Sequence, residues 1–242
     1  MKILVISDIH ANLTALEAVL RSAGSFDATW CLGDLVGYGP DPNECVQRVR
    51  ALPNLTCVKG NHDEAVSGTD DLEEFNGDAR RAALMTRQMI TPENMSFLQS
   101  LPDMVEREAV TLVHGSPRNP VWEYILEKST ARQNFASFGT DCAIVGHTHF
   151  PMIFALDADE HKVHTFIPLA DVPVNLVGRT ILNPGSVGQP RDNDSRASFA
   201  ILEPASMTWE LRRVTYDIAA VQERIRLKGL PARGADRLAD GW

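Results

Sequence analysis

The sequence lacks the long apolar segment that a membrane-spanning helix requires. No run approaches the 18 or more apolar residues needed to cross a bilayer. Internal repeats and low-complexity tracts are also absent, which argues against a solenoid or a disordered chain. The 242 residues are 44% hydrophobic and 23% charged, as in ordinary globular proteins. We therefore expect one large α/β domain without membrane contact, with room for a small cap.

Positive charge is in short supply as well. The chain has 23 Lys and Arg against 32 Asp and Glu, which gives a net charge of −9. This balance disfavours broad adhesion to nucleic acid or to an anionic membrane, so we expect no strong nucleic-acid binding. It leaves open an oligonucleotide that is held by metal ions in a cleft.

Cysteine is scarce, and its spacing does not match a zinc finger. The four cysteines, Cys31, Cys45, Cys57 and Cys142, lie mostly in apolar runs. With no recognisable secretion signal at the N-terminus, buried reduced thiols in a cytoplasmic protein are the expected state, and a disulfide pair is the alternative.

Strand-like and helical patterns alternate along the first sixty residues. Asn12 can cap a helix that ends near Gly24, and a second helix is predicted over Asn43–Leu52. Strands alternating with helices predict parallel βαβ units, whose ligands bind at the carboxyl ends of the strands. The strands predicted in this part are Ile3–Ser7, Thr29–Leu32 and Leu55–Lys59.

The rest of the chain changes in character twice. Residues 64–103 are rich in Glu, Arg, Ala and Met and predict a helical insertion beside the site, with a new helix at Pro92. The later strands follow one another without long helices and predict a second, partly antiparallel sheet. We expect a domain over residues 1–228 that closes with a helix at Asp217–Lys228, and a loosely held tail over 229–242. The later strands are Val110–His114, Cys142–Val145, Met152–Leu156, Val163–Phe166, Thr180–Leu182, Ser198–Glu203 and Thr208–Val214.

Five of the seven histidines lie in short motifs that also carry glycine, aspartate or asparagine. A single histidine of this kind is usually structural, but an ordered series of them indicates a metal site. Residues at i and i+2 on an extended backbone point to the same side and can reach one ion, and an aspartate can bridge two ions. The motifs are Asp8–Ile9–His10, Gly33–Asp34, Gly60–Asn61–His62–Asp63, Val113–His114–Gly115 and Gly146–His147–Thr148–His149.

The order of these motifs resembles the calcineurin-like metallophosphoesterase superfamily. A later turn, Asn183–Gly188, resembles one found in small bacterial members, which include phosphodiesterases and diadenosine-tetraphosphatase-related proteins. The resemblance implies a four-layer α/β/β/α sandwich of two mixed sheets flanked by helices. It also implies two divalent metal ions, with manganese expected first and iron, zinc, cobalt or nickel as alternatives.

The resemblance also implies a role for each motif residue. One ion would take Asp8, His10, Asp34 and His149, and the other would take Asp34, Asn61, His114 and His147. A hydroxide that bridges the ions would attack phosphorus, and His62 would act as the general acid or stabilise charge on the leaving oxygen.

One motif departs from the pattern of the protein phosphatases and the symmetrical dinucleotide tetraphosphatases. Those enzymes carry GDxVDRG, whereas this chain has Gly37 and Tyr38 in place of the second Asp and the Arg. Both assignments are weakened. The orientation of His62 must come from elsewhere, with Asp63 or a backbone carbonyl as the candidates.

Substrate contacts are predicted at three positions. Asn61 is expected to contact substrate as well as metal. Tyr38 is predicted to stack on a base or sugar, with loop packing as the alternative. Arg191 is predicted to bind phosphate, with an ion pair to Asp192 or Asp194 as the alternative.

The sequence therefore predicts a phosphodiesterase that acts on a small phosphoester or nucleotide. The alternatives are a nucleotide or dinucleotide polyphosphate hydrolase, a phosphomonoesterase and a metal-binding scaffold without activity. A homo-oligomer that contacts through the helical insertion is compatible with this prediction.

Overall fold

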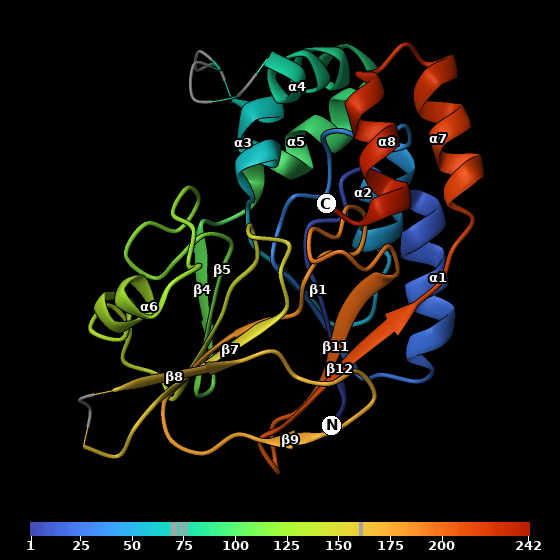
Figure 1. Cartoon of the computed structure of the whole chain (residues 1–242). Helices are drawn as coiled ribbons and strands as arrows, with labels where there is room; N and C mark the ends of the chain where they lie inside the picture. Colours follow the sequence, from blue (N-terminus) through green and yellow to red (C-terminus); the bar gives the residue numbers. More distant parts are fainter. Residues whose placement is uncertain (69–71, 73–74, 76, 160–161) are drawn as a thin grey trace.

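The structure, a computed structural model, describes residues 1–68, 72, 75, 77–159 and 162–242. In this part of the chain, two six-stranded mixed sheets pack face to face between helices (Figure 1). The first sheet has the order β3-β2-β1-β11-β12-β9 and the second β4-β5-β6-β10-β7-β8. The four-layer α/β/β/α architecture expected from the sequence is confirmed.

The first sheet joins a parallel half to an antiparallel half. The strands β1, β2 and β3 run parallel, whereas β11, β12 and β9 add to the other side of β1 in antiparallel fashion. The bounds are β1 Ile3–Ile6, β2 Ala28–Cys31, β3 Leu55–Cys57, β9 Val174–Asn175, β11 Ala197–Glu203 and β12 Thr208–Val214.

The second sheet is also mixed. Its central strands β5, β6 and β10 are parallel, and β4, β7 and β8 are antiparallel to their neighbours. The bounds are β4 Met104–Arg107, β5 Val110–Val113, β6 Cys142–Ile144, β7 Met152–Leu156, β8 Val163–Phe166 and β10 Thr180–Asn183.

The placement of β11 and β12 corrects one expectation. We expected these late strands in the second sheet, but β11 pairs with β1 in the first. All but the last residue of β11 are buried, which fits a strand covered on both faces rather than one at an exposed edge. Both β4 and β9 are short and were not predicted.

Alternation along the strands builds the layers. Ile3 and Val5 of β1 belong to the cluster between the two sheets, whereas Leu4 and Ile6 belong to the cluster under the helices. This is the period of two that a strand imposes on its side chains. The outer helices are α1 (Leu13–Ala23) and α2 (Pro42–Arg50) on the first sheet, and α6 (Lys128–Asn134) on the second.

The helices α4 (Gly77–Met89) and α5 (Pro92–Ser100) lie within the predicted insertion, whereas α3 (Asn61–Ser67) begins three residues before it, inside the His62 motif. Pro92 is the first residue of α5, and the Thr91 hydroxyl accepts a hydrogen bond from Asn94 N at 3.4 Å. Residues 69–71, 73, 74 and 76 of the insertion lie outside the described residues.

The C-terminal segment differs from the predicted loose tail. After α7 (Ile218–Leu227), residues Ala232–Asp240 form a further helix, α8, which packs on α7 (Figure 1). Ala235 and Leu238 are buried against Val221, and Met85 and Met89 of α4 pack on the same cluster. A composition rich in Gly, Ala, Arg and Asp concealed the short apolar face that this long-range contact buries.

Two further findings bear on the sequence predictions. All four cysteines are buried and free, as expected, so the alternative of a disulfide pair is excluded. Within the described residues, no helix is long and apolar enough to cross a bilayer.

If α8 is part of the folded core, Leu238→Ala will lower the free energy of unfolding by about 2 kcal/mol or more, because it removes a buried side chain. Leu238 is 3% exposed, whereas Leu227 on α7 is 77% exposed. The matched Leu227→Ala change should cost less than about 0.5 kcal/mol. Urea unfolding measures both; equal effects would mean that the tail is loose.

Candidate metal centre

The predicted metal-site residues meet at one end of the two sheets. Each follows the carboxyl end of a strand: β1, β2 and β3 in the first sheet and β5 and β6 in the second. All seven are buried at that edge, as the parallel arrangement requires. They are Asp8, His10, Asp34, Asn61, His114, His147 and His149.

The backbone at this edge is held in an unfavourable conformation. Five of the seven residues have a positive φ, among them Asp8 at 54°, Asp34 at 54° and His147 at 65°. Non-glycine residues avoid this region, and they persist in it where the surrounding structure fixes them, often at functional sites. The strain indicates that the side-chain positions, rather than the turns themselves, are what this edge requires.

The first cluster contains Asp8, His10, Asp34 and His149. Their ligand atoms all lie within 4.8 Å of one another. The Nε2 atoms of His10 and His149 are 3.0 Å apart, and His149 Nε2 lies 3.3 Å from Asp8 Oδ1. That Asp8 oxygen is buried and has no hydrogen-bond partner among the described residues.

The second cluster contains Asp34, His114 and His147, again within 4.8 Å of one another. His114 Nε2 lies 3.2 Å from His147 Nδ1 and 3.1 Å from Asn61 Oδ1. The same Asp34 oxygen, Oδ2, is 3.5 Å from both His114 Nε2 and His10 Nε2. Asp34 therefore stands between the two clusters.

Backbone carbonyls fix the outer nitrogen of each imidazole. A neutral imidazole has one N–H, and donating it to a carbonyl leaves a lone pair on the other nitrogen, directed into the cluster. Facing lone pairs repel unless a cation lies between them, so this donor set fits divalent metal ions. The pairs are His10 Nδ1 with Val36 O (3.2 Å), His114 Nδ1 with Leu32 O (2.7 Å), His147 Nε2 with Trp122 O (3.2 Å) and His149 Nδ1 with Gln189 O (2.6 Å).

Burial sets the charge of these groups. It holds the pKa of His10 and His149 well below the ordinary value and lowers the pKa of His147 to about 2. Burial also raises the pKa of Asp8 to about 7 and that of Asp34 well above its usual range. These three imidazoles are therefore neutral and able to bind a cation, and a bound cation would favour the ionised carboxylates.

Asp63 does not orient His62. Its carboxylate accepts hydrogen bonds from the backbone N–H groups of Leu35 (2.9 Å), Val36 (3.3 Å) and Gly60 (3.0 Å). It thereby ties the start of α3 to the loop after β2, which carries Asp34. One of the two explanations that we considered for the orientation of His62 is therefore wrong.

His62 is held by neighbouring rings instead. Its Nδ1 is buried and has no hydrogen-bond partner among the described residues, so no carbonyl orients it either. The rings of Tyr38 and Phe75 lie 4.5 Å and 4.8 Å from its centroid. Gly37, at φ 91°, leaves the space: a Cβ there would come within 2.4 Å of His62 Nδ1.

The turn Asn183–Gly188 is a support for the site. The Ser186 hydroxyl and the Gly188 N–H both donate to Asp8 O, at 2.8 Å and 2.9 Å. Asn183 Nδ2 donates to Gly146 O at 2.8 Å, beside His147. These hydrogen bonds hold the backbone of the turns that carry Asp8 and His147.

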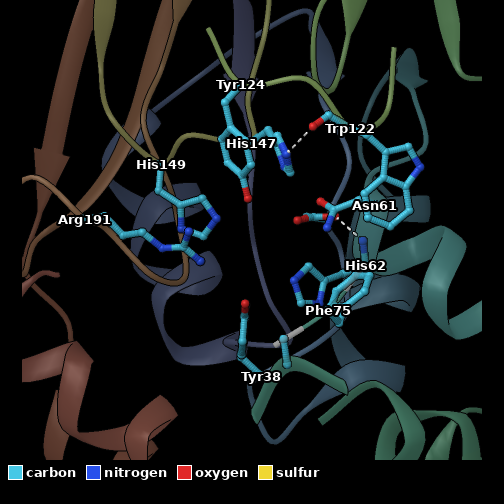
Figure 2. A pocket seen from close by; sticks show the side chains of 11 residues that line it. Tyr38, Asn61, His62, Phe75, Trp122, Tyr124, His147, His149 and Arg191 are labelled. Carbon is cyan, nitrogen blue, oxygen red and sulfur yellow. Dashed lines mark hydrogen bonds between the residues drawn. The ribbon is translucent and has the colours of Figure 1, made fainter. Parts of the chain in front are cut away.

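A cavity of about 170 Å³ opens above the two clusters, and Tyr38 and Arg191 both line it (Figure 2). The hydroxyl groups of Tyr38 and Tyr124 point toward each other across this space, with Arg191 on one side and His62 on the other. Arg191 Nη2 donates to Gln189 Oε1 at 3.0 Å, and its Nε has no partner among the described residues.

The alternative ion pairs of Arg191 do not form. Asp192 pairs with Arg213, and Asp194 pairs with Arg196 at 2.6 Å. The structure therefore leaves Arg191 facing the cavity.

Three aromatic residues of the cavity escaped the sequence analysis: Phe75, Trp122 and Tyr124. The ring of Tyr124 stacks on His147 with centroids 3.7 Å apart, and Phe75 meets Trp122 edge to face at 5.5 Å. Trp122 and Tyr124 follow the His114 motif by a few residues, which was the one local signal available.

Comparison with known proteins agrees with this geometry. Residues 1–207 match the calcineurin-like phosphoesterase superfamily domain. The chain belongs to this superfamily. As a calcineurin-like phosphoesterase it is a hydrolase, and its buried His and Asp clusters are suited to divalent metal ions.

Three known proteins are similar to this chain over more than half of its length. A metallophosphoesterase from Sphaerobacter thermophilus is 47% identical, with a TM-score of 0.92 over 100% of this chain and 99% of that one. The uncharacterized protein MJ0912 of Methanocaldococcus jannaschii is 37% identical over 98% of this chain and 96% of its own length. A symmetrical bis(5'-nucleosyl)-tetraphosphatase of Erwinia tasmaniensis is 28% identical over 58% of this chain. The matched region covers about half (53%) of that enzyme's length.

The metal centre predicts separable losses. His149→Ala should remove an ion from the first cluster and His114→Ala one from the second, whereas the exposed His164→Ala should retain both. Elemental analysis of the purified variants measures the ions. An ion at roughly 100-fold its dissociation constant should also add about 2.7 kcal/mol to the free energy of unfolding. Equal metal content in all three variants would contradict the assignment.

Proposed function

We propose that this phosphoesterase hydrolyses phosphodiesters with two divalent ions. The supporting observation is the lining of the cavity above the clusters: Arg191 is its one permanently charged cation among the described lining residues, and the other walls carry aromatic rings. A diester carries a single negative charge and an organic group on each side. One guanidinium and aromatic walls suit that combination better than they suit the dianion of a monoester.

The ligand sets follow the two clusters. One ion would be held by Asp8, His10, Asp34 and His149, and the other by Asp34, Asn61, His114 and His147. Bound ions supply a nucleophile from water at neutral pH and neutralise charge on the phosphoryl oxygens. Manganese is the ion we propose first, with iron, zinc, cobalt and nickel as alternatives for this mixture of Asp, Asn and His.

The side chains around the cavity bind and orient the ester. Arg191 can donate two N–H groups to the non-bridging oxygens, and the Asn61 amide lies next to the same space. His62 lines the cavity and is proposed as the group that protonates the leaving oxygen. Burial and the nearby Arg191 cation hold the pKa of His62 well below its ordinary value, so in the free site the ring is neutral and offers one N–H as a hydrogen-bond donor. To protonate the leaving oxygen, the ring must first take up a proton and act as the imidazolium.

A second proposal, hydrolysis of nucleotide or dinucleotide polyphosphates, has one supporting observation. The chain resembles the symmetrical tetraphosphatases over about half of their length. Against it, Gly37 and Tyr38 replace the Asp and Arg of their motif, and His62 Nδ1 has no acidic partner. A scaffold without activity is disfavoured because every predicted ligand is present and buried.

Two further parts of the proposal concern the location of the enzyme in the cell and its oligomeric state. Four free, buried cysteines are compatible with a cytoplasmic location. A homo-oligomer that contacts through the helical region stays a prediction.

The activity is tested on a panel of phosphoesters with manganese-loaded protein. We expect turnover of bis(p-nitrophenyl) phosphate at a kcat/KM at least about tenfold above that of p-nitrophenyl phosphate, because the cavity offers one cation beside the clusters. Diadenosine tetraphosphate tests the second proposal. No turnover on any of the three substrates, with two ions bound, would contradict an enzymatic role.

His62 should be separable from metal binding. His62→Ala is expected to lower kcat on the diester by about 10²-fold or more, because it removes the proton donor, while both ions are retained. His164→Ala serves as the exposed control. Kinetics and elemental analysis on the same preparations give both values. Loss of metal in proportion to activity would refute the separate role.

A further inference from the structure

A second cavity of about 110 Å³ adjoins the metal centre on the far side of Tyr38. This volume is several times the roughly 10–15 Å³ that one water needs. Tyr38 lines both cavities, and Gln189 lines the second while its side chain accepts from Arg191 of the first. A ligand that is bound over the metal clusters could therefore extend past the Tyr38 ring into this second space.

Helix α8 supplies the chemistry of the second cavity. Arg233 and Arg237 both line it. No ion pair with a carboxylate is formed by either of them in the part of the chain that the structure describes. Their guanidinium groups lie over the Trp242 ring, at 5.7 Å and 5.2 Å from its centroid. The Nε of Arg237 is buried and has no hydrogen-bond partner among the described residues.

The charges in this region are unbalanced. Asp78 of α4 is the one carboxylate among the described lining residues, against two guanidinium groups, with Arg191 across Tyr38. Burial, together with the Arg191 and Arg233 cations, lowers the pKa of Arg237. Positive groups that gather around a space with an unpartnered buried N–H are stabilised by an anion in that space.

We propose that this second cavity binds a further phosphate group on the substrate. The substrate is then a phosphodiester in which one of the two organic groups carries its own phosphate. Two guanidinium groups match a terminal phosphate, which carries nearly two negative charges and three acceptor oxygens, better than a singly charged carboxylate. This inference rests on the proposed phosphodiesterase function, because the scissile phosphate must lie over the metal clusters.

The test compares two dinucleotide probes: thymidylyl-thymidine with and without a 5′-phosphate. In the metal-loaded wild type, kcat/KM for the phosphorylated probe should exceed that for the other by about tenfold or more. In the double variant Arg233→Gln/Arg237→Gln this ratio should fall to within about twofold of unity. Because the ratio compares two substrates on one protein, a general loss of activity cancels.

Two control variants test whether the positive charge of the two arginines causes the preference for the phosphorylated probe. Arg21→Gln, an exposed arginine in the last turn of α1, should keep the wild-type ratio. Arg237→Lys retains the charge without the fork of donors and should keep part of the ratio. A wild type that treats the two probes equally, or a double variant that retains the preference, would overturn the proposal.

Binding separates this proposal from the proposed function. Dissociation constants for both probes are measured on metal-loaded His62→Ala protein, with and without the two arginine substitutions. If the wild type cleaves neither probe but the phosphorylated one binds about tenfold more tightly through the arginines, the phosphodiesterase proposal fails and the phosphate site stands. Equal or undetectable binding of both probes overturns the phosphate site.

Discussion

The structure depends on a repulsion that the protein cannot relieve by itself. Four buried imidazoles each donate an N–H to a backbone carbonyl, so their other ring nitrogens face one another in pairs at 3.0 Å and 3.2 Å. Asp34 Oδ2 lies 3.5 Å from one nitrogen of each pair. Lone pairs and a buried carboxylate at such distances are costly unless cations lie among them. The hydrogen bonds to the backbone carbonyls thus couple metal binding to the local fold.

The rest of the molecule can be understood as a frame for this arrangement. Two sheets bring their strand ends to one edge, and the strained turns after β1, β2 and β6 aim the ligands inward. Asp63 and Ser186 then secure the turns that carry Asp34 and Asp8 through backbone hydrogen bonds. Neither residue lines the cavity, yet each fixes a turn that bears a ligand.

The sequence predicted those features of the fold and of the site that depend on short segments of the chain. The motifs of the metal centre and most strands could be inferred because they are properties of short segments, whereas the four layers were implied by the resemblance that the order of the motifs carries. The structure then brought the predicted ligands together. What could not be inferred depends on distant contacts: the pairing of β11 with β1, the hydrogen bonds of Asp63, and the packing of α8 on α7 and α4.

Helix α8, which was not predicted, bears on which substrate the site prefers. Without α8, the site would offer Arg191 and a set of aromatic rings. With it, Arg233 and Arg237 extend the positive region beyond the Tyr38 ring. Substrate preference would then lie in the C-terminal segment rather than in the motif that the protein phosphatases share.

We propose that two cations, which share Asp34, separate the facing imidazoles. Anomalous diffraction from manganese-loaded crystals tests it most directly. Two anomalous peaks about 3.5–4 Å apart are expected, one beside His10 and His149 and the other beside His114 and His147, with Asp34 between them. A single peak, or peaks remote from Asp34, would contradict it.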